Sequence, residues 1–480
     1  MYPEKPLVLT EIGFDSLGQG ETEQALLLHD SLLAARETGC AGAYVFSWTD
    51  ESHTGGFDVT ALASGVVTMQ RQPKPARDSI ARVFAQSPRA TITEAPPMVS
   101  VVVATYNGGR TLRQCLDSLA TLNYTNYETI VVDDGSADNT SEILGEYSNI
   151  QVVRQPNMGL SEARNSGIRA AKGNIVAFTD SDCVVDPDWL DYLVSDMIRG
   201  NFAGVGGPNL TPPENRIVAR AIALAPGHAT HVLLNEYEAE HVPGCNMAFR
   251  REALLEIGGF NPIFRKAGDD VDVIWRLQDL GYKIGFSTGG FVWHHRRPTL
   301  KAYLRQQIGY GEAESQLLRK HPHRFNDRGQ SIWNGVIYSS SETTAAIGGP
   351  NIHYGVFGTA GFQCVYDRPA SLLSYVFTAI EWWIVCGCLI LIGMFWPSAF
   401  EIGIAGALVA LAISGLKAWR RCENTGADYR ILPLTWLLWA LQPVYRAGAR
   451  YWFRWRSSAP PVGFLQAMRK ASHGQPYFMR

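Results

Sequence analysis

The feature that most constrains the fold is an alternation of short apolar, β-branched runs with amphipathic stretches between residues 98 and 297. The runs predict strands, and the amphipathic stretches predict helices. The predicted strands are Val99–Ala104, Thr129–Asp133, Ile150–Arg154 and Ile175–Thr179, and two of the predicted helices are Thr111–Leu119 and Ser161–Ala171. This alternation predicts an α/β domain with a doubly wound sheet, whose ligands bind beyond the carboxyl ends of the strands.

Polar side chains gather where three of these strands end. They are Thr105, Tyr106, Asn107, Asp133, Asp134, Asp180 and Asp182. Because parallel strands end at one edge of a sheet, we expect these residues to form one site. Asp180 and Asp182 offer hard oxygen ligands that suit Mn²⁺ or Mg²⁺ carrying a diphosphate, although acidic residues at strand ends also serve as helix caps.

The composition indicates a large folded protein. The chain has 480 residues, a net charge of −3 and 46% hydrophobic residues, which suggests two to four domains and excludes a disordered or fibrous chain. None of the eight cysteines forms a C-x-x-C motif, so we expect a reducing compartment and no structural zinc. The first residues lack a basic and apolar leader, so we expect no cleaved signal peptide.

Residues 1–95 form the first predicted unit, in the order strand, helix, strand, helix. The segments LVLTEIGFDS, AGAYVFSWTDE and VVTMQRQPKPARDSIARVF resemble the last two βα units of the (β/α)₈ barrel of retaining glycoside hydrolases of the β-glucuronidase and β-galactosidase kind. The resemblance implies that Glu11 matches the nucleophile and Trp48 the end of strand eight. Six strands and the second carboxyl group are missing, so we expect a remnant without hydrolase activity. The alternative is half of a split glycosidase that another chain completes.

The C-terminal third predicts a membrane anchor. Two apolar runs, Leu372–Trp396 and Ala399–Leu416, predict a transmembrane hairpin over residues 371–417. Lys417, Arg420 and Arg421 follow the second run, and this charge bias places both ends of the hairpin in the cytoplasm.

Two further segments flank the predicted hairpin. Residues 298–370 are expected to be an amphipathic, interfacial region before it. Residues 418–480 are a basic tail, in which Ile431–Val444 is expected to be an interfacial helix rather than a third span. From Lys417 onward the chain has eleven Lys and Arg residues and two acidic residues, which suits contact with a membrane surface.

The middle of the chain carries several motifs in a fixed order: TYNGG, VVDDGSADNT, NMGLSEARNSGIRAAKG, FTDSDC, GCNMAF and AGDDVDVIWRLQDLGYKI. In this order they resemble the family 2 glycosyltransferases, which have the GT-A fold, and the resemblance spans about Met98 to Pro322. It implies a GT-A domain over residues 98–297. It also implies transfer of a sugar from a nucleotide-diphosphate sugar with inversion at the anomeric carbon.

The resemblance assigns roles to individual residues. Those implied to hold the donor are Thr105, Tyr106, Asn107, Asp133, Asp134, Arg164 and Asp180. Asp180 and Asp182 match the D-x-D motif that holds a divalent metal, Asp182 the more directly. Asp270 takes the place of the catalytic carboxylate in the pair Asp269-Asp270, and because the family has Glu at the first position, either residue could be the base.

A histidine after the next strand is often a further ligand in this family, and FVWHHRR offers His294 or His295. The alternative for this segment is a basic surface patch. Processive synthases carry Q-x-x-R-W, which occurs nowhere in this chain, so we expect single addition rather than polymer synthesis. The expected partners are a nucleotide-diphosphate sugar, a glycan or lipid acceptor and membrane lipids, without nucleic acid. The expected location is the inner membrane, with the catalytic domain facing the cytoplasm.

Overall fold

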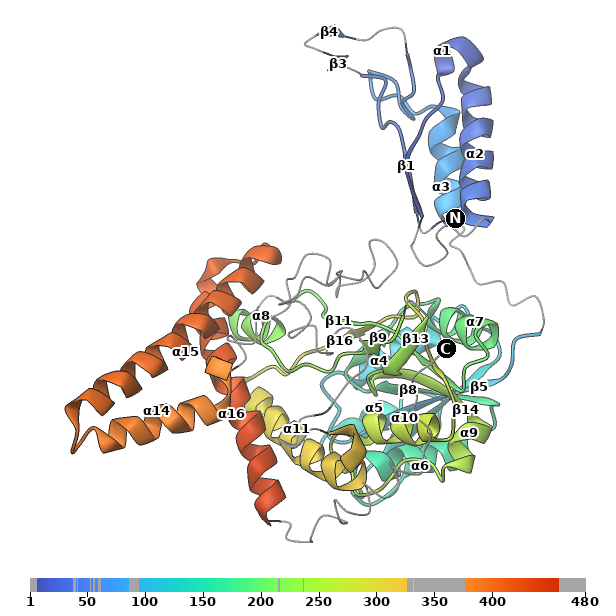
Figure 1. Cartoon of the computed structure of the whole chain (residues 1–480). Helices are drawn as coiled ribbons and strands as arrows, with labels where there is room; N and C mark the ends of the chain where they lie inside the picture. Colours follow the sequence, from blue (N-terminus) through green and yellow to red (C-terminus); the bar gives the residue numbers. More distant parts are fainter. Residues whose placement is uncertain are drawn as a thin grey trace. The chain divides into compact units, whose positions relative to one another are not determined.

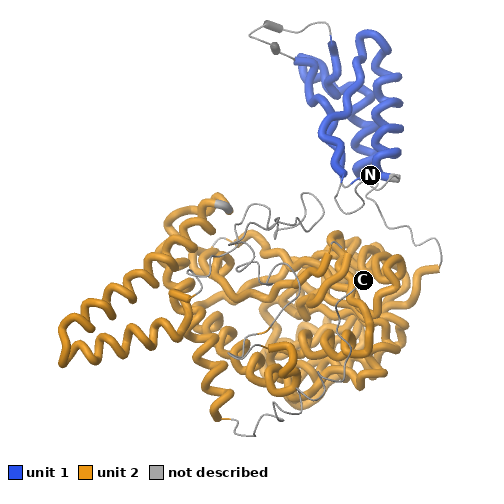
Figure 2. The backbone as a smooth tube through the Cα atoms, in the orientation of Figure 1, with its two compact units in different colours: residues 1–94, 355–360 blue, residues 95–354, 361–480 orange. Residues whose placement is uncertain are grey.

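The computed structural model describes residues 7–37, 40, 42–51, 53–54, 57–58, 62–85, 95–214, 216–235, 237–325, 331 and 376–456. The chain forms two compact units, shown in different colours in Figure 2. Unit 1 comprises residues 1–94 and 355–360, and unit 2 comprises residues 95–354 and 361–480.

Unit 1 has the predicted order of strand, helix, strand and helix. Its elements are β1 (Val8–Ile12), α1 (Ser16–Gln19), α2 (Glu21–Glu37), β2 (Gly42–Val45), β3 (His53–Thr54), β4 (Phe57–Asp58) and α3 (Pro75–Ala85). Strands β1 and β2 pair in parallel, with α1 and α2 as the crossover between them. Helix α3 packs along α2 (Figure 1). Their buried faces form a small apolar core around Leu28, Leu32, Val67, Ile80 and Val83.

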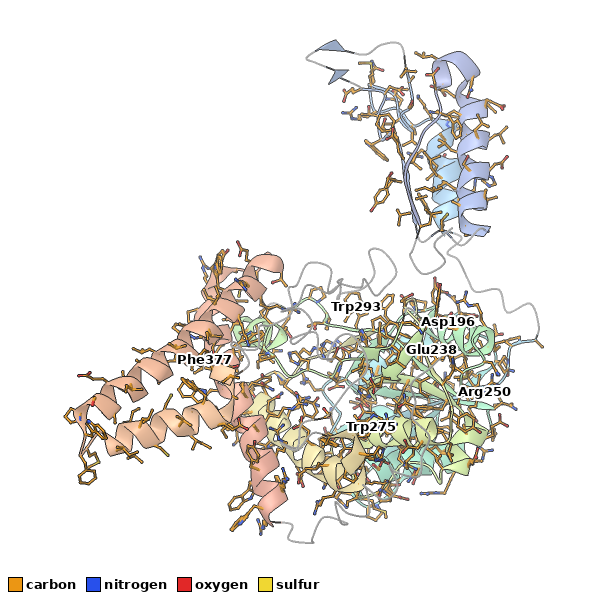
Figure 3. The ribbon with its side chains drawn as sticks, viewed as in Figure 1. Asp196, Glu238, Arg250, Trp275, Trp293 and Phe377 are labelled. Carbon is orange, nitrogen blue, oxygen red and sulfur yellow. The ribbon has the colours of Figure 1, made fainter. Side chains whose placement is uncertain are left out.

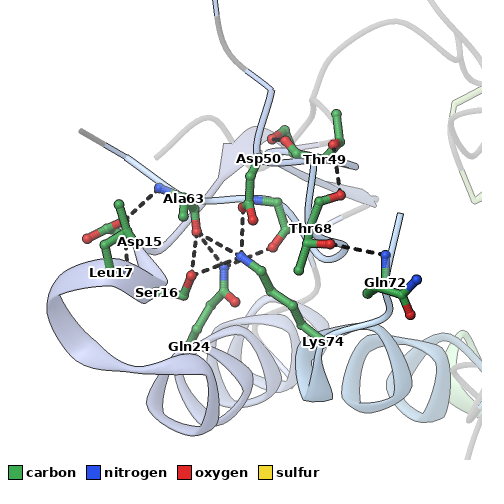
Figure 4. A network of polar contacts seen from close by, with 12 residues as sticks. Asp15, Ser16, Leu17, Gln24, Thr49, Asp50, Ala63, Thr68, Gln72 and Lys74 are labelled. Carbon is green, nitrogen blue, oxygen red and sulfur yellow. Dashed lines mark hydrogen bonds and ion pairs between the residues drawn. The ribbon is translucent and has the colours of Figure 1, made fainter. Parts of the chain in front are cut away.

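A buried polar network fastens the loops of unit 1 to its helices (Figure 4). The Lys74 ammonium donates to a carboxylate oxygen of Asp50 at 2.7 Å, to the Ser16 hydroxyl at 2.9 Å and to the Ala63 carbonyl at 3.2 Å. The Gln24 amide donates to the Ala63 carbonyl as well, at 3.3 Å. The Lys74 side chain is only 2% exposed, so its charge depends on Asp50.

The described part of unit 1 does not form a barrel. Its parallel sheet has two strands, and Glu11 on β1 is an exposed side chain. Trp48 is also 63% exposed. Neither residue lies in an enclosed pocket of the kind that retaining hydrolysis requires, so the resemblance to a glycoside hydrolase is not supported.

Unit 2 is built on a nine-stranded mixed sheet. From edge to edge its order is β12 (Val232–Leu233), β13 (Glu238–His241), β15 (Ile284–Phe286), β10 (Gly204–Gly206), β14 (Asn246–Arg250), β8 (Ile175–Asp180), β5 (Val99–Thr105), β6 (Tyr127–Asp133) and β7 (Gln151–Arg154). The last four strands are parallel, and they are the strands predicted from the sequence. The other half is mixed, because β14 runs antiparallel to both β8 and β10. The fold is therefore mixed α/β.

Helices cover both faces of the sheet, as a doubly wound sheet requires (Figure 1). The helices of this unit's first part are α4 (Leu112–Ala120), α5 (Thr140–Leu144), α6 (Leu160–Ala170), α7 (Trp189–Arg199), α8 (Ile217–Ala223), α9 (Arg251–Glu256) and α10 (Asp269–Asp279). Helices α6, α9 and α10 share one apolar core with the sheet. Figure 1 shows α7 on the opposite face.

A second, three-stranded sheet lies beside the end of β8. Its order is β11 (Asn209–Leu210), β16 (Val292–His294) and β9 (Cys183–Val185). Strands β16 and β9 are antiparallel, and His294 pairs directly with Cys183. This register brings the HHRR segment next to the residues that follow β8.

Helix α11 (Leu300–Lys320) leads from the sheets to the C-terminal helices and packs along α16 (Leu432–Arg456). A buried cluster with Tyr303, Ile431 and Leu438 joins these helices to α8. The predicted interfacial helix Ile431–Val444 is thus part of a longer helix that continues through Pro443. Helix α11 is followed by a 3₁₀ turn, η1 (Pro322–Arg324), and α16 is preceded by another, η2 (Tyr429–Ile431).

The predicted hairpin is present as α14 (Ile380–Ile392) and α15 (Pro397–Asn424), which pack against each other. Residues 397–423 are long and apolar enough to cross a membrane. Helix α14 is shorter than predicted. Its 13 residues span only ~20 Å, whereas the hydrocarbon core of a membrane is ~30 Å thick. Residues 371–375 lie outside the described residues.

The apolar side chains of this hairpin are exposed. Figure 3 shows side chains projecting outward along both α14 and α15, and Phe377 marks the start of this region. Examples are Leu391 at 65%, Phe395 at 92% and Leu408 at 60% exposure. The described side chains of these helices therefore form an exposed apolar surface.

We predict that Lys74→Met lowers the free energy of unfolding of unit 1 by about 3–5 kcal/mol, because it leaves Asp50 without its buried partner. Denaturant unfolding of the full chain measures the change, with proteolytic cleavage within residues 62–85 as the signal that unit 1 has unfolded. Arg77→Met is the matched control, since the Arg77–Asp78 pair is on the surface and is worth about 0–1 kcal/mol. Equal effects of the two substitutions would contradict the assigned role of Lys74.

Candidate active site

The candidate site begins at the carboxyl ends of the central parallel strands. Strand β5 pairs Thr105 with Asp133 on β6 and Ala104 with Asp180 on β8. The polar residues that follow these strands are therefore neighbours along one edge of the sheet, as predicted. A change in strand order also occurs here, since β5 is flanked by β6 and β8, and such points form ligand crevices in α/β sheets.

Arg164 connects the two acidic pairs. It lies on α6, which packs across β5 and β6, and is 2% exposed. One guanidinium nitrogen donates to Asp180 at 3.0 Å and to the Gly244 carbonyl at 2.9 Å, and the other donates to Asp269. Gly244 must be glycine for this approach, because a Cβ there would lie 2.9 Å from the guanidinium.

The charges around Arg164 depend on one another. Burial opposes the charge of Arg164, but Asp269 and Asp180 outweigh it and raise the guanidinium pKa above its ordinary value. Burial raises the pKa of Asp269 to about 6, and the guanidinium acts in the opposite direction. A buried carboxylate in this position is stable only with its partner.

The structure distinguishes Asp269 from Asp270, which the sequence left open. The Asp269 side chain is 2% exposed and occupied by Arg164. The Asp270 side chain is 18% exposed, accepts a hydrogen bond from the Gly244 amide at 2.9 Å and lies 3.9 Å from the His241 imidazole. Asp270 is therefore the member of the pair that can reach a substrate.

Helix α10, which carries both residues, is held firmly. Its Asp272 is fully buried and accepts from Arg276 at 2.8 Å, from Lys320 at 2.8 Å and from His321 at 2.9 Å. Trp275 on the same helix is buried (Figure 3) and lies edge-on to His321. These contacts fix the first turn of α10 against the end of α11.

Asp182, His294 and Arg297 form the other part of the site. The His294 Nε2 atom lies 3.4 Å from one Asp182 oxygen, and an Arg297 nitrogen lies 3.2 Å from the other. Burial would raise the pKa of Asp182, but His294 and Arg297 hold it below its ordinary value. His295 instead contacts Gln114 at 3.1 Å, so of the two histidines offered by the sequence, His294 faces the carboxylates.

The ligand atoms of Asp180, Asp182 and His294 all lie within 4.8 Å of one another. Two carboxylates and an imidazole suit Mn²⁺ well and Mg²⁺ acceptably. Burial acts to lower the pKa of His294, but Cys245 and Asp182 raise it to about 10. A cation that binds to the imidazole must therefore displace a proton. The residues present fit the predicted metal.

Two residues predicted to hold the donor make hydrogen bonds within the loops. Asp134 accepts hydrogen bonds from Gln155 at 2.7 Å, from the Met158 amide at 2.8 Å and from the Gly159 amide at 2.8 Å, which uses both of its oxygens. Asn107 accepts from the Ala137 amide at 2.8 Å. Both residues tie neighbouring loops together.

Three other predicted donor residues remain available along this edge. Tyr106 is 55% exposed. Asp133 uses one oxygen to accept from the Ser136 amide at 2.9 Å. The Thr105 hydroxyl is buried and has no hydrogen-bond partner among the described residues, which is unusual and suits contact with a ligand.

Sequence reasoning missed three functional neighbours. His241 lies beside Asp270, and burial lowers its pKa although Asp270 acts in the opposite direction. Arg297 contacts Asp182 although its side chain is 42% exposed, and Arg296 contacts Asn209 at 3.1 Å. The sequence signal for the two arginines was their place in FVWHHRR, shortly after His294.

Residues 100–258 match the family described as "Glycosyl transferase family 2". A "Pre-mycofactocin glycosyltransferase" of Mycobacterium tuberculosis is 30% identical over 232 residues, which is 47% of this chain and 48% of the relative. A "Poly-beta-1,6-N-acetyl-D-glucosamine synthase" of Staphylococcus epidermidis is 25% identical over 46% of this chain and 55% of the relative. The chain thus spans about half the length of these curated relatives.

A solved structure that is similar to this chain is the mannosyltransferase PcManGT from Pyrobaculum calidifontis, in complex with GDP-Man and Mn²⁺. It is 19% identical, with a TM-score of 0.42, and the similarity covers 76% of this chain and 89% of that chain.

We predict that Arg164→Met destabilises unit 2 by about 3–5 kcal/mol, because Asp269 remains buried without its partner. The pKa of Asp269 is then raised further. A carboxyl group whose pKa is higher in the folded than in the unfolded state stabilises the fold at low pH and loses this effect as the pH rises. The variant should therefore be more stable in mildly acidic than in mildly alkaline buffer, as measured by denaturant unfolding.

The control is the double variant Arg164→Met/Asp269→Asn, which should lose this pH dependence. If the double variant keeps it, Asp269 is not the group that titrates.

Proposed function

We propose that this chain, whose residues 100–258 form a family 2 glycosyltransferase domain, is a membrane-anchored enzyme that transfers one sugar from a nucleotide-diphosphate sugar to a hydroxyl acceptor with inversion. The acceptor is a glycan or a lipid-linked molecule. The observation that carries this proposal is the position of Arg164, which contacts both Asp180 and Asp269. Arg164 thereby holds Asp180, part of the proposed donor site, close to Asp269, which neighbours the proposed base Asp270. Displacement at one carbon requires such proximity of the two sites.

The donor centre consists of Asp180, Asp182, His294 and the strand edge that carries Thr105. Two carboxylates and an imidazole would hold Mn²⁺ or Mg²⁺ there. Such an ion neutralises the charge that develops on the leaving diphosphate. The buried Thr105 hydroxyl and one oxygen of Asp133 remain to bind the nucleoside. These features support a GT-A type of donor site.

The acceptor centre is Asp270. Inversion requires a general base on the acceptor hydroxyl, on the side of the sugar opposite the leaving group. One oxygen of Asp270 is oriented by the Gly244 amide, and the carboxylate is partly exposed to a substrate. Asp269 pairs with Arg164, so it holds the guanidinium in place and does not accept the proton. Asp270 takes the acceptor proton as the new glycosidic bond forms.

The proposed membrane anchor is the hairpin of α14 and α15. It is supported by the exposure of its apolar side chains and by the length and composition of residues 397–423. Lys417, Arg420 and Arg421 follow the apolar part of α15 and favour a cytoplasmic location for that end and for the catalytic domain. Helix α16 lies against α11 and joins the hairpin to that domain.

Single addition is favoured over processive synthesis because the chain lacks Q-x-x-R-W. The alternative of a glycosidase half completed by another chain has less support, since Glu11 is exposed and the parallel sheet in the described part of unit 1 has two strands. Unit 1 is accordingly proposed to be a structural remnant.

The kinetic prediction separates the two centres. Asp182→Ala should weaken metal-dependent donor binding together with turnover, because the diphosphate loses its counter-charge in the ground state and in the transition state. Asp270→Asn keeps size and hydrogen bonding but cannot accept a proton, so turnover should fall by about 10²- to 10⁴-fold with donor affinity nearly unchanged. Donor titration and single-turnover rates measure both, using the nucleotide sugar that supports turnover in isolated membranes.

Asp269→Asn is the matched control for Asp270→Asn. It should impair folding and the placement of Arg164 more than proton transfer, so its unfolding curve should shift, whereas that of Asp270→Asn should not. A larger turnover defect from Asp269→Asn in a fully folded variant would move the base one residue earlier. Near-normal turnover in both variants would remove this pair from the reaction.

The anchor prediction is that detergent releases the protein from membranes, whereas high salt and carbonate leave it bound. The apolar hairpin would bury its surface in the hydrocarbon core, while a peripheral protein held by its basic tail would be released as salt screens its charges. Fractionation of membranes followed by immunoblotting measures the release. Extraction by salt alone would show that the hairpin does not insert.

A further inference from the structure

Two cysteines, Cys183 and Cys245, lie close to His294. Cys183 on β9 directly follows Asp182, and Cys245 follows Gly244 at the start of β14. Both thiols are free, and Cys183 and Cys245 are 1% and 3% exposed. The two sulfur atoms and one imidazole nitrogen of His294 all lie within 4.8 Å of one another. These residues are far apart in sequence: the β9–β16 pairing places Cys183 opposite His294, and Cys245 directly precedes β14, which pairs with β8.

This arrangement has the dimensions of a soft-metal site. A tetrahedral zinc ion with bonds of about 2.3 Å to sulfur and 2.0 Å to nitrogen places its ligand atoms roughly 3.5–4 Å apart, so only a small contraction is required. Thiolates select soft or borderline ions such as Zn²⁺ over Mg²⁺ and Mn²⁺.

The surroundings also suit such a site. The Asn209 amide donates to the Cys245 sulfur at 3.6 Å, a contact that orients the sulfur. The Cys245 carbonyl accepts from the Thr179 hydroxyl at 3.1 Å, which fixes the backbone at that point. A water-excluded group of two thiols and an imidazole therefore exists before any ion binds.

We propose that Cys183, Cys245 and His294 form a second cation site that takes a soft divalent ion, Zn²⁺ in the first place, and that its occupation withdraws His294 from Asp180 and Asp182. The two candidate ligand sets share the single imidazole of His294. Zinc would thereby oppose the hard metal at the carboxylates. The binding part of this proposal stands alone, and its inhibitory consequence rests on the proposed function.

Co²⁺ titration of the full-length, detergent-solubilised protein tests the site directly, because cobalt replaces zinc and gives a thiolate-to-metal charge-transfer band. We expect one equivalent of Co²⁺ to produce this band in the wild type and one equivalent of Zn²⁺ to remove it. Cys183→Ala and Cys245→Ala should each raise the apparent Kd by more than about 100-fold, since changes outside the ligand set already cost 10- to 100-fold.

Cys115→Ala is the matched control. Cys115 is equally buried and lies near Asp180, whose carbonyl accepts from its thiol at 3.6 Å, but it is not among the three grouped residues. This variant should keep the band, and so should Asp180→Asn, which alters the carboxylate site and a partner of Arg164 but none of the three grouped residues. If an alanine variant unfolds, Cys183→Ser and Cys245→Ser preserve size and test the same point.

A second measurement tests the consequence. Zn²⁺ added at fixed Mn²⁺ should lower sugar transfer in the wild type, and the zinc concentration for half inhibition should rise in Cys183→Ala relative to the uninhibited rate of that variant. Absence of the charge-transfer band in the wild type, or its survival in Cys183→Ala/Cys245→Ala, overturns the site. A band without any sugar transfer would instead overturn the proposed function and leave the site intact.

Discussion

The arrangement of the whole site depends on one buried positive charge. Arg164 is almost entirely removed from water, and it is stable there because Asp180, Asp269 and the Gly244 carbonyl surround it. Asp180 ends β8, Asp269 begins α10 and Gly244 lies two residues before β14, so the same contacts that stabilise the charge also set the distances between these elements. Removing the charge would therefore loosen the site and the fold together.

Much of this could be predicted from sequence because the relevant signals are local. The strands from Val99 to Asp180 are short runs of β-branched residues, and a polar residue after each strand must lie at the same sheet edge. The family motifs then assigned the carboxylates. Local patterns also predicted α2, α6 and α15. Most ends of these helices lie within a few residues of the expected positions.

Other parts depend on pairing between distant segments, which no local pattern reports. The contact of Arg297 with Asp182 and the pairing of Cys183 with His294 depend on the register of β9 with β16, and Cys245 joins them from the segment before β14. The choice between Asp269 and Asp270 required the position of Arg164. The cysteine spacing predicted no structural zinc because spacing reports only ligands that are close in sequence. Cys183, Cys245 and His294 are far apart in sequence.

The three-stranded sheet also constrains how this region can change by insertion or deletion. Side chains alternate between the two faces of a strand, so a gain or loss of one residue within β16, ahead of His294, would turn the His294 side chain away and present Trp293 or His295 in its place. A change of two residues would restore the face while shifting the position along the strand. Length variation within this strand should therefore be tolerated only where compensating bulges recover the original alternation.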